Sequence, residues 1–303
     1  MLKAIMCVLS VACLQPAWAD TVHSVDQIPS RLKTPEGKAF VAQQMDGAPA
    51  PDGLGVHLPP GLPAKTITSL LVPADDAGTP NLIGAKPWSG RADSFVAIVC
   101  TGGEGPLAPN EPQCARSQDD DAKRPLHVYL GVIEVKDGAA PRLVAGSGPV
   151  DGAVNWAKSG LPAQPMAVDD ANGADIRPDS FDRFDLAAYK VAPDVQAFGL
   201  RGAWQESYSG GGAAYGSLQL FVLDGDRIKP ILAAPMSAYS DVAGDWHKDG
   251  TRDHTILDGA NVLVVAAHSV DHYFDLTLKS RAGHWQRLFR WSQAAGAYRP
   301  VGN

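Results

Sequence analysis

The sequence predicts an all-β protein of antiparallel hairpins, propeller-like or a sandwich, with a short N-terminal helix and a loop-rich N-terminal segment. From about residue 95 onward, runs of Val, Ile, Leu, Phe and Tyr alternate with polar residues and stop at turn residues, which is the pattern of half-buried strands. The 31 Gly and 24 Pro suit a chain with many tight turns. Few segments show the helical spacing of apolar residues.

Residues 1–19 have the pattern of a secretory signal peptide. Lys3 supplies the positive start, residues 4–14 are mostly apolar, and Ala17-Trp18-Ala19 is an A-x-A cleavage site. The apolar run is too short for a permanent anchor, and we expect no transmembrane segment elsewhere. Lipidation at Cys13 is the alternative form of processing. We therefore expect a periplasmic or secreted protein.

Residues 20–94 are predicted to be a loop-rich N-terminal segment with one short helix. Thr34 is suited to the N-cap, Pro35 to the first helical position and Glu36 to the first turn, with Phe40, Val41 and Met45 as the apolar side. The stretches around this helix are rich in Pro, Gly and Asp. We assign the all-β domain to residues 95–303.

The strands of that domain follow from the alternating pattern. We expect them at residues 95–100, 127–135, 142–145, 184–191, 196–203, 217–223, 227–233, 262–267, 273–279, 285–291 and 298–301. A strand, a Gly turn and a second strand recur near residues 130–144, 218–232 and 288–299. Such hairpins occur in propeller blades and in any meander, so both arrangements stay open.

Cysteine usage predicts one disulfide bond. Removal of residues 1–19 leaves Cys100 and Cys114. In an oxidising compartment, two remaining cysteines close in sequence are expected to pair.

Charge and motif content exclude some functions. Lys+Arg number 26 and Asp+Glu 33, giving a net charge of −7, and no basic cluster of five or more occurs. Nucleic-acid binding needs clustered cations, so we exclude it. No G-x-S-x-G elbow is present and nothing else in the sequence names a reaction. We expect a non-catalytic binding protein with a protein or glycan partner in the cell envelope.

A candidate calcium loop spans residues 245–253. Aspartates stand at its first, fifth and ninth places, with Gly250 at the sixth. This spacing resembles the D-x-[DN]-x-D-G-x-x-D calcium loops of integrin-type (FG-GAP and VCBS) propeller repeats. The alternative is a polar hairpin loop whose aspartates make turn hydrogen bonds. The residues predicted to bind Ca²⁺ are Asp245, His247, Asp249, Thr251 through its carbonyl, and Asp253, with His247 acting through water or not at all.

The same region is rich in histidine, which gives a second metal hypothesis. Two histidines that flank an expected turn could face one another and bind Zn²⁺ with a third ligand, as in a metal-dependent hydrolase. The alternative is that all are ordinary strand-end residues. The histidines are His247, His254, His268 and His272, among Asp249, Asp271 and Asp275.

A glycine-rich stretch is the candidate partner-binding loop. The string S-G-x-G-x-x-Y resembles the loop that periplasmic and membrane-bound inhibitors of C-type lysozyme insert into the enzyme. The resemblance implies that Ser209 would approach the enzyme's catalytic carboxylates and that Tyr215 would brace the loop, so the alternative function is an inhibitor or immunity-type protein against a cell-wall hydrolase such as lysozyme. The alternative is a plain connector between strands 196–203 and 217–223. The residues concerned are Ser209, Gly210, Gly211, Gly212 and Tyr215.

Overall fold

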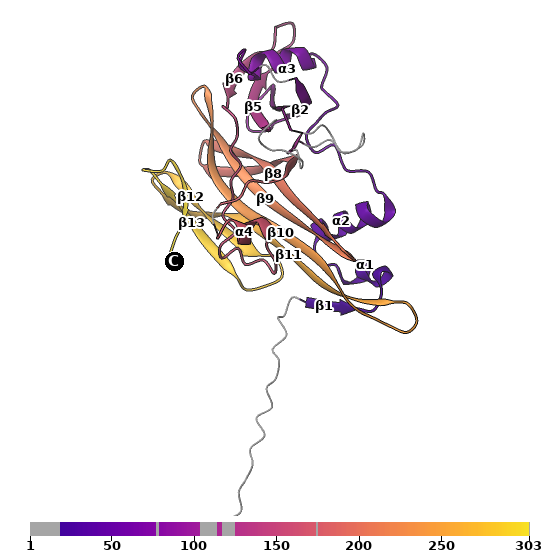
Figure 1. The fold of residues 1–303 in the computed structure, drawn as a ribbon. Coiled ribbons are helices and arrows are strands. Elements are labelled where there is room, and N and C mark those ends of the chain that lie inside the picture. The colour runs from indigo at the N-terminus through magenta and orange to yellow at the C-terminus, as the bar shows by residue number, and fades with distance from the viewer. Residues whose placement is uncertain (1–18, 77–78, 104–113, 117–124, 174, 303) are drawn as a thin grey trace, which may run out of the picture.

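The structure is a computed structural model. It describes the chain except for residues 1–18, 77–78, 104–113, 117–124, 174 and 303. The predicted signal peptide, apart from Ala19, and Cys13 lie outside the described residues. The described chain is mostly β, which confirms the all-β prediction (Figure 1).

The strands form two antiparallel meanders joined into one sheet. A single parallel contact between Arg227 and Gly146 joins them. The first meander contains β2 (Pro80–Pro87), β3 (Ser94–Thr101), β5 (His127–Glu134) and β6 (Arg142–Gly146). The second contains β7 (Ser180–Ala192), β8 (Val195–Tyr208), β9 (Gly211–Asp224), β10 (Arg227–Trp246), β11 (Arg252–Val270), β12 (Tyr273–Ser280), β13 (Gln286–Ser292) and β14 (Ala297–Pro300). Two short strands, β1 (Ala19–Val22) and β4 (Cys114–Ala115), pair with β11 and β7.

Packing between strand layers gives the fold its sandwich character. Side chains of β3 and β5, including Ile98 and Leu130, share a core with Phe198 and Phe221 of β8 and β9. Leu220 instead packs with residues of β12 and β13 in a second core. Successive residues of a strand point to opposite faces, so β9 is buried on both sides.

The predicted strands are present, but those of the long hairpins extend well beyond their predicted ends. The segment predicted at 227–233 is the start of β10, which continues to Trp246. Its pairing with β9 shifts register near Pro230 and Pro235. Such irregularities let a strand continue past prolines that cannot donate a ladder hydrogen bond. Pairing with neighbouring strands, and not local composition, therefore sets the strand ends.

The predicted N-terminal helix is confirmed as α2 (Pro35–Asp46). The Thr34 side chain accepts a hydrogen bond from the backbone N–H of Gly37 at 2.9 Å. The buried carboxylate of Asp258 on β11 accepts from the N–H groups of Lys33 and Thr34 at 2.6 and 2.8 Å, and from the Thr34 hydroxyl at 2.5 Å. These bonds fix the start of α2 against the sheet, beside the long strands (Figure 1).

The N-terminal segment contains further elements that the sequence analysis did not predict. They are η1 (Val25–Gln27), α1 (Ile28–Arg31), α3 (Ala64–Leu71) and strands β1 and β2; α4 (Met166–Asp170) lies later in the chain. In α3, Ile67 and Leu71 are buried against β3 and β5. No helix among the described residues is long and apolar enough to cross a membrane.

The predicted disulfide is confirmed. Cys100 at the end of β3 is bonded to Cys114 in β4, with their Cα atoms 6.0 Å apart. Since β4 pairs with β7, the bond ties the first meander to the edge of the second.

Candidate functional site

The candidate calcium loop is the turn of the β10–β11 hairpin. The N–H of His247 donates to the carbonyl of Thr251 at 2.8 Å, and Gly250 N–H donates to the carbonyl of His247 at 3.1 Å. Gly250 has φ +86°, the left-handed conformation that a three-residue hairpin turn favours at this place. The Asp249 carboxylate accepts from the Thr251 N–H and hydroxyl at 3.0 and 2.7 Å. Gly250 and Asp249 therefore stabilise the conformation of the hairpin turn.

The five predicted calcium ligands separate into different groups. Asp249 and Thr251 are hydrogen-bonded to each other, Asp245 is exposed, and the His247 imidazole is hydrogen-bonded to the Asp253 carboxylate. The hydrogen bonds to Thr251 lower the pKa of Asp249, and the bond to Asp253 raises the pKa of His247. Calcium binding at this loop stays a prediction.

A third side chain, His23, joins His247 and Asp253. One carboxylate oxygen of Asp253 lies 2.7 Å from His247 Nε2 and 2.8 Å from His23 Nδ1. Among the described residues, these three form the group of His, Cys, Asp and Glu side chains close enough to share a metal ion. The sequence analysis missed His23, because only the pairing of β1 with β11, Val22 opposite His254, brings it there.

The four histidines proposed as a zinc cluster are not brought together in the described structure. Each pairs with a different carboxylate, so a shared zinc site of His268 and His272 is not formed in this structure. The pairs are His247 with Asp253, His254 with Asp241, His268 with Asp275 and His272 with Asp194, at 2.7 to 3.1 Å.

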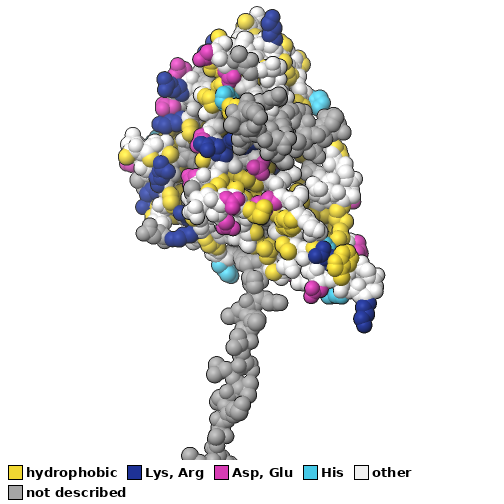
Figure 2. Space-filling view, viewed as in Figure 1, with side chains coloured by type: hydrophobic (Ala, Val, Ile, Leu, Met, Phe, Trp, Pro, Cys, Tyr) yellow, Lys and Arg dark blue, Asp and Glu magenta, His cyan; other side chains and the backbone are white. Residues whose placement is uncertain are grey.

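The tip of the β10–β11 hairpin carries an exposed aromatic side chain. Trp246 is 69% exposed, and the guanidinium carbon of Arg252 lies 5.2 Å from its ring centre. Figure 2 shows hydrophobic, basic, acidic and histidine side chains gathered at the lower right, where this hairpin projects. A large exposed aromatic side chain indicates a candidate contact surface, because Trp and Tyr are enriched where proteins bind their partners.

The glycine-rich stretch is mostly strand and not an extended loop. Only Ser209 and Gly210 form the turn between β8 and β9, and Gly210 has φ +81°. Gly211 lies in β9, where a β-carbon would collide with the carbonyl oxygen of Asp241 on β10. Tyr215 is buried against Trp156, with ring centres 5.8 Å apart. The cross-strand ladder from Trp204–Tyr215 to Tyr208–Gly211 therefore replaces the expected loop.

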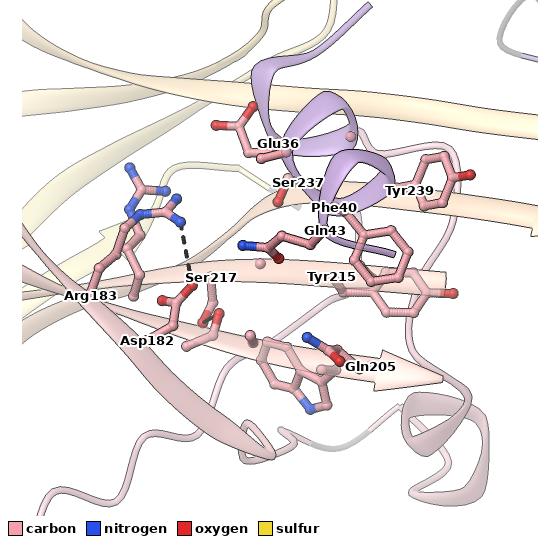
Figure 3. A pocket seen from close by; sticks show the side chains of 18 of the residues that line it. Glu36, Phe40, Gln43, Asp182, Arg183, Gln205, Tyr215, Ser217, Ser237 and Tyr239 are labelled. Atoms are coloured by element: carbon pink, nitrogen blue, oxygen red, sulfur yellow. Dashed lines mark hydrogen bonds and ion pairs between the residues drawn. The ribbon is translucent and has the colours of Figure 1, made fainter. Parts of the chain in front are cut away.

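A pocket of about 200 Å³ lies between α2 and the face of β8–β10 (Figure 3). Its aromatic walls come from Phe40 on α2 and from Trp204, Tyr215 and Tyr239 on the sheet. Phe40 and Tyr239 have ring centres 5.3 Å apart. Burial raises the pKa of Tyr215 and of Tyr239, so both phenols stay neutral hydrogen-bonding groups.

Polar side chains line the same pocket. Gln43 and Gln205 provide amides, Ser237 a hydroxyl and Asp182 a carboxylate (Figure 3). Burial raises the pKa of Asp182, against the opposing effect of nearby arginines, and its Oδ1 has no hydrogen-bond partner among the described residues. The sequence analysis missed this pocket, because its residues come from α2, β7, β8, β9 and β10 and form no motif.

Comparison with protein-family models, with curated proteins and with solved structures finds no match. The local resemblances to calcium loops and to lysozyme inhibitors therefore stay predictions.

Proposed function

We propose that the protein is a non-catalytic binding protein of the cell envelope that holds a saccharide residue in the pocket beneath α2. The observation that carries the proposal is the combination of unpaired polar side chains and aromatic rings in one pocket. Saccharides present hydroxyl groups that donate and accept hydrogen bonds, and carbon faces that pack on aromatic rings.

The polar groups are available to a ligand. In the described structure, the side chains of Gln43, Gln205 and Ser237 make no hydrogen bond within the protein, and all three line the pocket. The amides both donate and accept, and the hydroxyl does the same. A ligand with many hydroxyl groups meets these requirements better than an apolar one.

The size of the pocket limits the ligand. Pockets for drug-sized molecules are commonly about 300–1,000 Å³, whereas this one is about 200 Å³. One sugar ring, as a free molecule or as the end of a longer glycan, suits this volume.

The Cys100–Cys114 disulfide supports the proposed location. Such bonds persist mainly in oxidising compartments, including the periplasm and the extracellular space. Cleavage after Ala19 would retain Asp20, Thr21 and Val22, which pair with β11. Mass spectrometry of the protein from a periplasmic extract should find Asp20 as the first residue, and an intact N-terminus would contradict the signal-peptide prediction.

Titration calorimetry with a panel of mono- and disaccharides, including peptidoglycan disaccharides, tests the saccharide proposal. Gln43→Leu removes the amide from the pocket at nearly constant volume and should weaken binding at least tenfold, which is about 1.4 kcal/mol. Gln44→Leu is the matched control, since Gln44 follows Gln43 on α2 and does not line this pocket. Absence of saturable binding across the panel, or equal losses in the two variants, would contradict the proposal.

We propose inhibition of a cell-wall hydrolase as the second candidate function. The observation that favours it is that Ser209 and Gly210 are exposed in the β8–β9 turn, beside Arg252 of the projecting hairpin. Activity of C-type lysozyme with equimolar protein tests this function. Ser209→Trp enlarges the turn without entering the core and should relieve inhibition; full lysozyme activity with micromolar wild-type protein would remove this target.

A further inference from the structure

We propose that His23, His247 and Asp253 bind a zinc ion, or a divalent transition metal of similar ligand preference, at the projecting end of the β10–β11 hairpin. This site is separate from the saccharide pocket and does not depend on its function. The proposal rests on two imidazoles and a carboxylate that converge from distant parts of the chain.

The ligand atoms already lie close to the arrangement that zinc requires. One atom from each side chain lies within 4.8 Å of the other two. The imidazole rings meet edge to face, with an interplanar angle of 74° and centres 5.6 Å apart. Zinc bonds of about 2.0–2.2 Å place tetrahedral ligand atoms about 3.3 Å apart. The two nitrogen–oxygen separations of 2.8 and 2.7 Å therefore need to open by only about 0.5 Å.

The side chains are free to make this adjustment. The side chain of His23 is 73% exposed, that of His247 38% and that of Asp253 28%. Both imidazole nitrogens now face the same carboxylate oxygen, to which they donate their hydrogens. In the metal-bound form each hydrogen moves to the other ring nitrogen, and the freed lone pair binds the ion.

The ligand types favour a transition metal over calcium. Imidazole nitrogen suits zinc, copper and nickel, whereas calcium prefers oxygen ligands. Asp245 and Asp249 lie near enough to His247 to add attraction for a cation. The Arg252 side chain is held elsewhere, against Trp246 and on the carbonyl of Gly244 at 2.8 Å.

The ion would fasten β1 to the hairpin. His23 follows β1, a strand of four residues, while Asp253 lies in β11 and His247 in the turn beyond β10. Three protein ligands leave a fourth position of a tetrahedral site open. A water molecule or a side chain of a partner can occupy it.

Zinc titration of the untagged protein by calorimetry at pH 7.5 tests the site. We expect one zinc ion per chain, with His23→Ala and His247→Ala each weakening binding at least tenfold. His57→Ala is the matched control, because His57 pairs with Asp52 at 2.8 Å but has no second imidazole in a metal-binding group of the described structure. Cobalt substitution should give the visible absorption bands of a tetrahedral site.

A further variant separates this site from the predicted calcium loop. The two ligand sets share His247 and Asp253, but His23 belongs only to the zinc site and Asp249 only to the calcium loop. Asp249→Ala removes a nearby charge but no zinc ligand, so it should weaken zinc binding by much less than the tenfold expected of His23→Ala. Equal zinc affinity of wild type and His23→Ala, or no saturable zinc binding, would overturn the proposal; circular dichroism of each variant confirms that it is folded.

Discussion

Replacing Asp258 with Ala should release the start of α2 from the sheet. The carboxylate accepts hydrogen bonds from the Lys33 and Thr34 N–H groups and from the Thr34 hydroxyl, and Asp258 is only 5% exposed. Thr34 in turn caps α2 through its bond from Gly37. The change therefore removes the acceptor that holds the cap in place.

The expected magnitude follows from the two N–H groups left without their acceptor. Each costs about 1–3 kcal/mol when its environment excludes water, so the free energy of unfolding should fall by about 2–6 kcal/mol. The lower end of the range applies if the start of α2 detaches and the N–H groups of Lys33 and Thr34 reach water. Because α2 covers the pocket, saccharide affinity should fall with stability.

Urea denaturation followed by circular dichroism measures the effect. Asp137→Ala, at an exposed aspartate in the turn after β5, is the control and should change stability by less than about 0.5 kcal/mol. Thr34→Ala and the double variant complete a thermodynamic cycle, in which the two losses should not add because the side chains share a hydrogen bond. A loss below about 0.5 kcal/mol for Asp258→Ala, or full additivity in the cycle, would refute the reasoning.

Other parts of the structure give three further predictions. Arg142 and two further cations lower the pKa of Glu134 to about 2 from 4.5. The ionised carboxylate therefore stabilises the folded state fully above pH 4.5, and this contribution is lost as the pH falls towards 2. Glu134→Gln should lower the free energy of unfolding at pH 7 and match wild type in urea unfolding near pH 2. Cys100→Ser should lower unfolding free energy by about 2–5 kcal/mol; an unchanged urea midpoint would contradict this. Millimolar Ca²⁺ should raise the melting temperature of chelator-stripped protein, and Asp249→Ala should abolish the shift; identical wild-type melting curves with and without Ca²⁺ would remove the calcium prediction.

Local chemistry made α2 predictable. Thr34, Pro35 and Glu36 supply a cap, a first position and a favourable charge within three residues, and the structure uses the cap as expected. Helix α3 has no such start signal, because Pro63 makes no side-chain cap and the first turn holds no acidic residue; only Ile67 and Leu71, spaced one helical turn apart, indicate it. This spacing lies among Pro- and Gly-rich segments, which favour loops.

Long-range pairing limited the rest of the prediction. The start of β9 contains Gly and Ala, which do not favour strands by themselves, and becomes strand because it pairs with the end of β8 on one side and with β10 on the other. His23 reaches Asp253 only through the β1–β11 pairing, across most of the chain. The composition of residues 245–253 identified a turn with polar side chains. The imidazole that joins this turn from outside it, that of His23, is brought there only by tertiary structure.

The exposed position of Trp246 gives the protein an internal optical probe. Trp88, Trp156, Trp204 and Trp291 are at most 9% exposed, whereas Trp246 is 69% exposed. Trp285 is partly exposed, so iodide in solution should quench the Trp246 emission most strongly and the Trp285 emission less, and should leave the blue-shifted emission of the four buried indoles. Events at the hairpin tip and loosening of the interior then appear as separate fluorescence changes in one titration, without an attached dye.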